Sequence, residues 1–178
     1  MPKKEEKRVV GIKNYIILIA ICLITIFVAF GIRQRYMAYQ EYELTKSVLK
    51  GKINEVSEEE LTAYVNAHPD AILYVQVNED SNSRNVGKKL YKVLQKRNLL
   101  TESVYINLGN VSNRAEFYNT FNSNYAKDST KKLSNYPALV IFSDGKVIDM
   151  VSKKKGRPLD ISDIEQLFDE HEMDDSEW

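Results

Sequence analysis

A continuous apolar stretch near the N-terminus constrains this chain more than any other feature of its sequence. The run from Tyr15 to Ile32 contains no charged residue, and the nearest charges, Lys13 and Arg33, stand just outside its two ends. As a helix the run spans roughly 27 Å, close to the hydrocarbon thickness of a bilayer. A charge at the centre of such a span costs about 2.5 to 3.5 kcal/mol on insertion scales. The sequence therefore predicts a transmembrane helix over residues 15–32.

Basic residues are distributed unequally on the two sides of this span. Lys3, Lys4, Lys7, Arg8 and Lys13 precede it, whereas Arg33 and Arg35 are the only basic residues among the ten that follow it. The positive-inside rule then makes residues 1–14 a cytoplasmic tail and places the rest of the chain outside the cell membrane, in a cell that we expect to be bacterial. One alternative is a signal peptide cleaved near Ala29–Gly31, where small residues flank a phenylalanine. A lipid anchor at Cys22 is disfavoured because a large residue precedes that cysteine.

Composition limits the chemistry available to the remainder of the chain. The 25 Lys and Arg residues are balanced by 25 Asp and Glu residues, so there is no overall basic field for nucleic acid. Cys22 is the sole cysteine and lies in the apolar run, which excludes an intrachain disulfide and a thiolate metal site in the folded part. His68 and His171 lack metal-ligand spacing. We expect no nucleic-acid partner, no metal and no cofactor.

The sequence after the span predicts a helical stalk and then one α/β domain. Residues 33–52 form the stalk, because no Gly or Pro interrupts the helix-forming composition before Gly51. Residues 53–173 form the domain, and residues 174–178 an acidic tail. The predicted elements of the domain are a helix opened by the capping box of Ser57 and Glu60, a strand over 71–77, a helix bearing Val86, Leu90 and Leu94, a strand over 103–108, a helix bearing Phe117, Phe121 and Tyr125, strands over 137–143 and 146–152 joined at Asp144-Gly145, and a helix capped by Ser162 and Glu165.

This order of elements predicts a mixed sheet. A parallel strand-helix-strand half is followed by an antiparallel hairpin, which gives four to five strands with helices covering both faces.

Two local patterns, together with the element order, resemble the thioredoxin family over roughly residues 53–173. The run from Tyr136 to Val147 (YPALVIFSDGKV) is similar to the family's stretch from its cis-proline through its C-terminal hairpin. The run from Ala71 to Asp80 (AILYVQVNED) is similar to the family strand that leads into its Cys-x-x-Cys motif. The resemblance implies a thioredoxin-like fold and a cis Tyr136–Pro137 peptide bond.

The reactive motif of the family is missing from this sequence. An alignment without gaps also puts Val75 at the family's buried acid and Lys89 at its helix-kinking proline. Thiol exchange needs an attacking thiolate and a resolving thiol, and a serine hydroxyl supplies neither. Ser81 or Ser83 is instead predicted to be an N-cap, and no catalytic residue is assigned. The residues at the Cys-x-x-Cys positions are Ser81, Asn82, Ser83 and Arg84.

Recognition is the function that the resemblance favours. In thioredoxin-like proteins the loop before the cis-proline pairs with an extended peptide through main-chain hydrogen bonds, which needs no cysteine. Tyr136, beside Pro137, is the expected pairing residue, and Arg84 is available to a carboxylate in a polar rim formed by residues 81–84. The predicted function is a membrane-tethered, redox-inactive module that binds a protein or peptide partner. The resemblance includes accessory thioredoxin-like proteins near bacterial export machinery, which implies an accessory role in secretion or envelope assembly.

Two other functions stay open at this point. One is a thiol-disulfide oxidoreductase-related protein that acts with thiols from another chain, or a different chemistry that uses Ser81 and Arg84. The other is a structural membrane subunit that assembles through its span and stalk. The basic loop formed by Lys153, Lys154, Lys155 and Arg157 is interpreted as a solvated loop, with an acidic partner or anionic lipid as the alternative.

Overall fold

The computed structural model describes residues 11–127 and 129–173, so the predicted acidic tail and most of the predicted N-terminal tail lie outside the described residues. Contacts divide the chain into two units, Met1–Glu43 and Leu44–Trp178. The described part of the first unit is the helix α1 (Ile12–Thr45), which runs two residues into the second unit and has no buried residue. By length and composition α1 is able to cross a membrane.

The helix α1 ends at Thr45, earlier than the Gly51 predicted from the sequence. The residues that follow turn back into the second unit, where Leu49 and Ile53 are buried. Their burial ends the helix, because a continued helix would carry the apolar Leu49 away from the core that covers it. Residues 46–52 are therefore part of the domain's packing rather than of a free stalk.

The second unit is built on a five-stranded sheet with the order β1-β3-β2-β4-β5. Strands β1 and β2 pair parallel with β3, whereas β4 pairs antiparallel with both β2 and β5. The predicted mixed sheet is confirmed, and its fifth strand, β1, is too short to show in the sequence pattern. The strands are β1 (Asn54–Glu55), β2 (Ile72–Gln76), β3 (Ser103–Asn107), β4 (Ala138–Ser143) and β5 (Lys146–Ser152).

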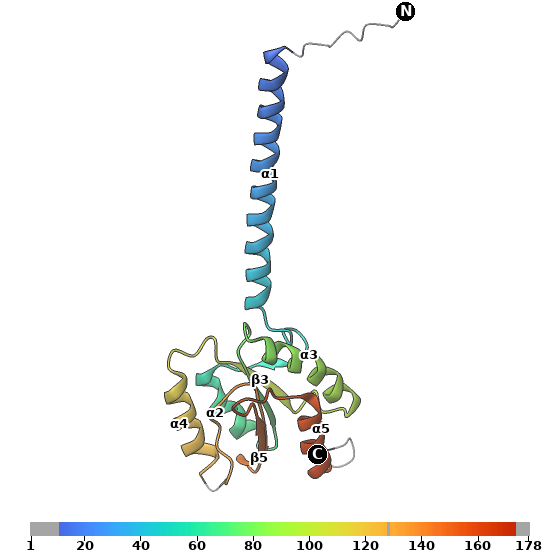
Figure 1. Cartoon of the computed structure of the whole chain (residues 1–178). Helices are drawn as coiled ribbons and strands as arrows, with labels where there is room; N and C mark the ends of the chain where they lie inside the picture. The colour runs from blue at the N-terminus through green and yellow to red at the C-terminus, as the bar shows by residue number, and fades with distance from the viewer. Residues whose placement is uncertain (1–10, 128, 174–178) are drawn as a thin grey trace, which may run out of the picture. The chain divides into compact units, whose positions relative to one another are not determined.

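Helices cover both faces of this sheet (Figure 1). Side chains of β2 alternate between the two faces, since Leu73 and Val75 belong to one buried cluster and Ile72 and Tyr74 to the other. The helices α2 (Glu58–Ala67) and α4 (Arg114–Tyr125) pack on the first face, and α3 (Ser81–Lys96) and α5 (Ile161–Glu170) pack on the second.

The helix caps agree with the sequence prediction at α2 and differ at α5. Ser57 and Glu60 form the predicted capping box. The helix α5 begins earlier than predicted, with Asp160 as N-cap and Asp163 completing the box in place of Ser162 and Glu165. Both pairs have the spacing of a capping box, and burial of Leu159 just before the helix favours the earlier start.

Candidate functional site

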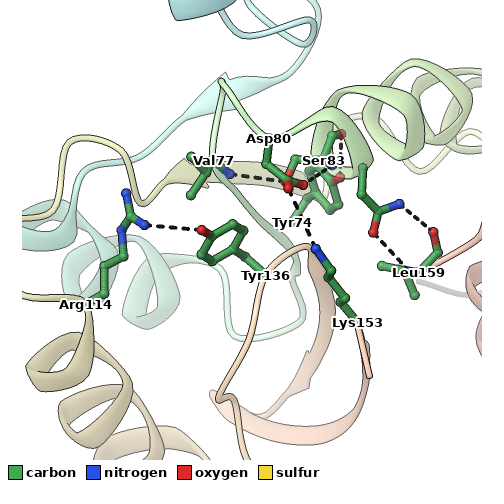
Figure 2. Close-up of polar contacts among 9 residues, drawn as sticks. Tyr74, Val77, Asp80, Ser83, Arg114, Tyr136, Lys153 and Leu159 are labelled. Atoms are coloured by element: carbon green, nitrogen blue, oxygen red, sulfur yellow. Dashed lines mark hydrogen bonds and ion pairs between the residues drawn. The ribbon is translucent and has the colours of Figure 1, made fainter. Parts of the chain in front are cut away.

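The candidate site lies where β2 leads into α3, and Asp80 organises it. The Asp80 carboxylate accepts hydrogen bonds from the Ser83 N–H at 2.6 Å and from the Ser83 hydroxyl at 2.9 Å (Figure 2). Asp80 is the N-cap of α3, so the prediction that Ser81 or Ser83 has this role is wrong. A carboxylate is the better acceptor here, because its charge also interacts favourably with the positive end of the helix dipole.

Ser83 is a structural residue rather than part of an exposed rim. Its side chain is fully buried, and its hydroxyl oxygen lies 3.4 Å from the Val77 N–H, which donates to it. Its carbonyl accepts a hydrogen bond of 2.8 Å from the Tyr74 hydroxyl. Burial, and secondarily the Asp80 charge, raises the pKa of that hydroxyl, which therefore stays a donor. The predicted polar rim is wrong for Ser83.

Asn82 joins the start of α3 to the segment before α5. Its amide nitrogen donates to the Leu159 carbonyl at 2.9 Å, and its amide oxygen accepts from the Leu159 N–H at 3.1 Å (Figure 2). Ser81 is exposed beside this contact and lines a shallow hollow of about 280 Å³ with Lys89 and Pro158. Of the four predicted rim residues, Ser81 is the one that remains at the surface without a structural hydrogen bond from its side chain among the described residues.

Arg84 contributes to the fold through one of its guanidinium nitrogens. Its Nη1 atom lies 2.8 Å from the Lys46 carbonyl, 3.2 Å from the Leu44 carbonyl and 3.3 Å from the Asn78 carbonyl. These oxygens include carbonyls at the end of α1, where a helix leaves acceptors without intrahelical donors. Arg84 therefore connects the segment after α1 to the end of β2 through Nη1, and its predicted availability to a carboxylate stays a prediction.

The Tyr136–Pro137 bond is cis, as the resemblance implied. Tyr136 is half-buried, and its hydroxyl oxygen lies 3.3 Å from Nη1 of Arg114 (Figure 2). The Arg114 guanidinium carbon lies 5.3 Å from the centre of the Tyr136 ring, which is the geometry of a cation–π contact. Arg114 is itself held by a hydrogen bond of 2.9 Å from Nε to the Leu108 carbonyl.

Lys153 connects this proline to the start of α3. Its N–H donates to the Pro137 carbonyl at 2.9 Å, and its ammonium nitrogen lies 3.8 Å from the Asp80 carboxylate. The register agrees, because Ala138, just after the proline, pairs with Val75 near the end of β2. The two sequence patterns that carry the resemblance thus meet where β2 ends and β4 begins, and we call this place the Tyr136–Pro137 edge.

The main chain of Tyr136 is unused within the fold. Neither its N–H nor its carbonyl takes part in a hydrogen bond among residues 11–127 and 129–173. The neighbouring Pro137 carbonyl, by contrast, is paired with Lys153. The site therefore offers one main-chain donor and one main-chain acceptor immediately before the cis bond.

Three residues of the site escaped the sequence prediction. Asp80 was detectable in principle, since it is an N-cap residue type directly before the predicted helix. Arg114 was not singled out, and Lys153 was interpreted only as part of a solvated loop, because their contacts join segments distant in sequence.

Comparison with solved structures adds the fold relationship. The chain is similar to thioredoxin f2 of Chlamydomonas reinhardtii, with a TM-score of 0.51 and 12% sequence identity over 67% of this chain and 95% of that chain. The domain has a thioredoxin-like fold. Thioredoxin of Plasmodium falciparum matches with a TM-score of 0.47 and 10% identity, over 67% of this chain and 99% of that one. Thioredoxin O1 of Arabidopsis thaliana matches with a TM-score of 0.45 and 14% identity, over 66% of this chain and 96% of that one.

The likeness is one of fold alone at these identities. No protein-family model matches the sequence, and no curated protein matches it. The chemistry of the thioredoxin-like domain therefore has to be argued from its own residues, among which the positions at the start of α3 are Ser81 to Arg84 and the chain's single cysteine, Cys22, lies in α1.

Proposed function

We propose that this chain is a membrane-anchored, redox-inactive thioredoxin-like module that binds an extended segment of a protein partner at the Tyr136–Pro137 edge. The observation that carries the proposal is the free main chain of Tyr136, placed beside the N-terminus of α3 and held by the Arg114 contact. An extended peptide laid against this edge would pair with the Tyr136 N–H and carbonyl, as an added strand does.

The side chains at the start of α3 support binding without thiol exchange. The Ser83 hydroxyl is buried and hydrogen-bonded, and the Asp80 carboxylate is committed to the helix cap and to Lys153. Ser81 is exposed, and although Lys89 and Asp160 line the same hollow, its hydroxyl forms no hydrogen bond with either of them among the described residues, as an activated nucleophile would with its base. These hydrogen-bonded groups form one side of the site. None of them is a thiol, so they cannot carry out thiol–disulfide exchange.

The apolar part of α1 supports the anchoring. Residues 15–32 carry no charge, and the residues that directly flank them contain more Lys and Arg on the N-terminal side than on the C-terminal side, which favours a cytoplasmic N-terminus and an external domain. An external binding module fixed to a cell membrane suits an accessory role in secretion or envelope assembly.

An insulin-reduction assay tests the redox-inactive part of the proposal. The purified full-length chain in detergent, with a reductant too slow to act alone, should show no turnover above the blank. A cysteine-containing thioredoxin in the same detergent is the positive control. Turnover by this chain would contradict the proposal and favour the oxidoreductase alternative.

Photocrosslinking in intact cells tests the binding edge. A photoreactive residue replaces Tyr136, or Tyr91 on α3 as a second half-buried tyrosine, or Tyr39 in α1. We expect position 136 to capture one partner whose crosslinked peptide, identified by mass spectrometry, is an extended segment, and position 91 to capture none of it. Capture through position 39 alone would contradict the binding edge and favour a structural subunit.

A further inference from the structure

Four exposed lysines lie on α3 and on the segment that leads from α1 into the domain, and these two segments contact each other. We call the surface of Lys50, Lys52, Lys88 and Lys92 the lysine face. All four side chains are exposed. Lys88 and Lys92 are one helical turn apart and lie on the same side of α3, while Lys50 and Lys52 come from the segment after α1.

Specific contacts bring these two segments together. The Lys52 ammonium lies 5.0 Å from the ring centre of Tyr91, which is beside Lys88 and Lys92 on α3. A Cβ atom added to Gly87 would meet the Val48 side chain at 3.0 Å, so the segment passes directly over the helix there. Arg84 completes the attachment through the Lys46 carbonyl.

The lysine face has no acidic residue within the two segments that form it. Residues 44–53 and 81–97 contain no Asp or Glu. Lys50, Lys88 and Lys92 form no ion pair among the described residues, whereas the next lysine along, Lys89, lies 3.6 Å from Asp160. The helix α2 shows the opposite composition, since it opens with Glu58, Glu59 and Glu60. The domain's charge is therefore segregated, although the whole chain is neutral.

We infer that the lysine face binds the anionic headgroups of the phospholipid bilayer in which α1 is anchored. The inference rests on the proposed anchoring. Juxtamembrane lysine clusters are attracted to anionic leaflets within about one Debye length, which is roughly 8 to 10 Å near physiological salt. The tether sets the distance between the domain and the bilayer. Along a helix, Leu44 lies roughly 18 Å from Ile32, and the headgroup layer takes up about 5 to 7 Å of that distance. The remaining distance of roughly 11 to 13 Å exceeds one Debye length by only a few ångströms, which the extended side chain of a lysine can span.

Because α1 tethers the domain to the bilayer, even a weak attraction between the lysine face and the headgroups is enough for contact. A surface held within this short distance meets the headgroups at a high effective concentration, so the charges of the lysine face need not bind free lipid tightly to occupy the bilayer surface. An acidic protein would be attracted by the same charges, and the lipid is favoured because the lysine face begins on the segment that continues directly from α1.

Energy transfer in nanodiscs tests the inference with the full-length chain. A donor dye is attached at Asn85→Cys, an exposed position of α3, in a Cys22→Ser background, and the acceptor dye is carried by lipid headgroups. Discs contain phosphatidylcholine alone or an equal mixture with phosphatidylglycerol. We expect greater transfer in the mixed discs and loss of the difference at high salt. Equal transfer in both lipids overturns the inference.

Two matched pairs of charge reversals distinguish an effect of the lysine face from an effect of the net charge of the protein. Lys88→Glu with Lys92→Glu should abolish the effect of phosphatidylglycerol, whereas Lys127→Glu with Lys146→Glu, which changes the same number of exposed charges elsewhere, should retain it. Equal behaviour of the two pairs overturns the lysine face as the contact. A chain that fails to enter either disc contradicts the anchoring itself, so the two failures are distinguishable.

Discussion

Asp80 caps α3 with a charged oxygen, and replacing it tests whether this residue or its serine neighbour fixes the helix start. Asp80→Ala removes the acceptor for both the N–H and the hydroxyl of Ser83. Loss of such a cap lowers the free energy of unfolding by about 1 kcal/mol. Ser81→Ala, one residue away and exposed, should change it by less than about 0.5 kcal/mol. Chemical denaturation of both variants decides, and a larger loss in Ser81→Ala would contradict the assignment of the cap.

Asp149 on β5 makes the stability of the domain depend on pH at the acid end. Partial burial raises the pKa of its carboxyl, but hydrogen bonds from Lys131 at 2.5 Å and from the Met150 N–H at 2.6 Å, and the His171 ring nitrogen at 3.1 Å, lower the pKa by more. The net pKa lies below the ordinary 3.8. A carboxyl with a depressed folded-state pKa stabilises the fold above its unfolded pKa, and this stabilisation is lost as the pH falls through the folded value.

Asp149→Asn should therefore lower the free energy of unfolding by about 1.5 to 3 kcal/mol at neutral pH, which is the range for hydrogen bonds to a charged group. The difference from the wild type should shrink as the pH falls below 3.8. Denaturation curves across the acid range give this comparison. Glu165→Gln, at an exposed site on α5, is the control and should follow the wild type at each pH. A difference for Asp149→Asn that stays constant down to the acid limit would be evidence against this linkage.

At the scale of the element, the segment after α1 belongs to the domain. Replacing Leu49 tests how much the packing of this segment contributes to the stability of the domain. Leu49 is completely buried, whereas Leu44, at the end of α1, is 44% exposed. Leu49→Ala should lower the free energy of unfolding of the domain by about 2 to 5 kcal/mol, because it leaves a cavity beneath α3. Leu44→Ala should lower it by less than about 0.5 kcal/mol. Similar small losses in both variants would mean that residues 46–52 are a stalk after all.

The helices and strands of the domain were largely predictable because their apolar periodicities are unambiguous. Val86, Leu90 and Leu94 repeat at helical spacing and are buried together, and Asp144-Gly145 joins two strands as its turn chemistry requires. The ends of elements were less predictable. Nothing in the residues from 33 to 49 interrupts a helix, so only the burial of Leu49 in a tertiary core shows where α1 ends.

At the scale of the whole molecule, the sequence predicted only those parts of the candidate site that a local sequence pattern marks. The YPALVIFSDGKV run located Pro137 and its cis bond, and the strand before Ser81 located the start of α3. The contacts of Arg114 with Tyr136 and of Lys153 with Asp80 join segments that are distant along the chain. Local propensity contains no information about such pairs. For the same reason the burial of Ser83, which was predicted to be part of a polar rim, could not be read from the sequence.

Cysteine labelling tests the orientation of the whole molecule in the membrane. In a Cys22→Ser background, Glu59→Cys places a thiol on an exposed position of α2, and Lys7→Cys places one before the span. A membrane-impermeant maleimide should label position 59 in intact cells and position 7 only after the membrane is opened, because basic residues that flank a span are retained in the cytoplasm.

The mass of the labelled protein separates an anchor from a cleaved signal peptide in the same experiment. An anchored chain keeps residues 1–32, so the Lys7→Cys protein remains intact and becomes labelled after permeabilisation. Cleavage near Ala29–Gly31 would leave a protein that lacks position 7 and is never labelled there. Labelling of position 7 in intact cells, with position 59 protected, would reverse the orientation and place the Tyr136 edge and the lysine face on the cytoplasmic side.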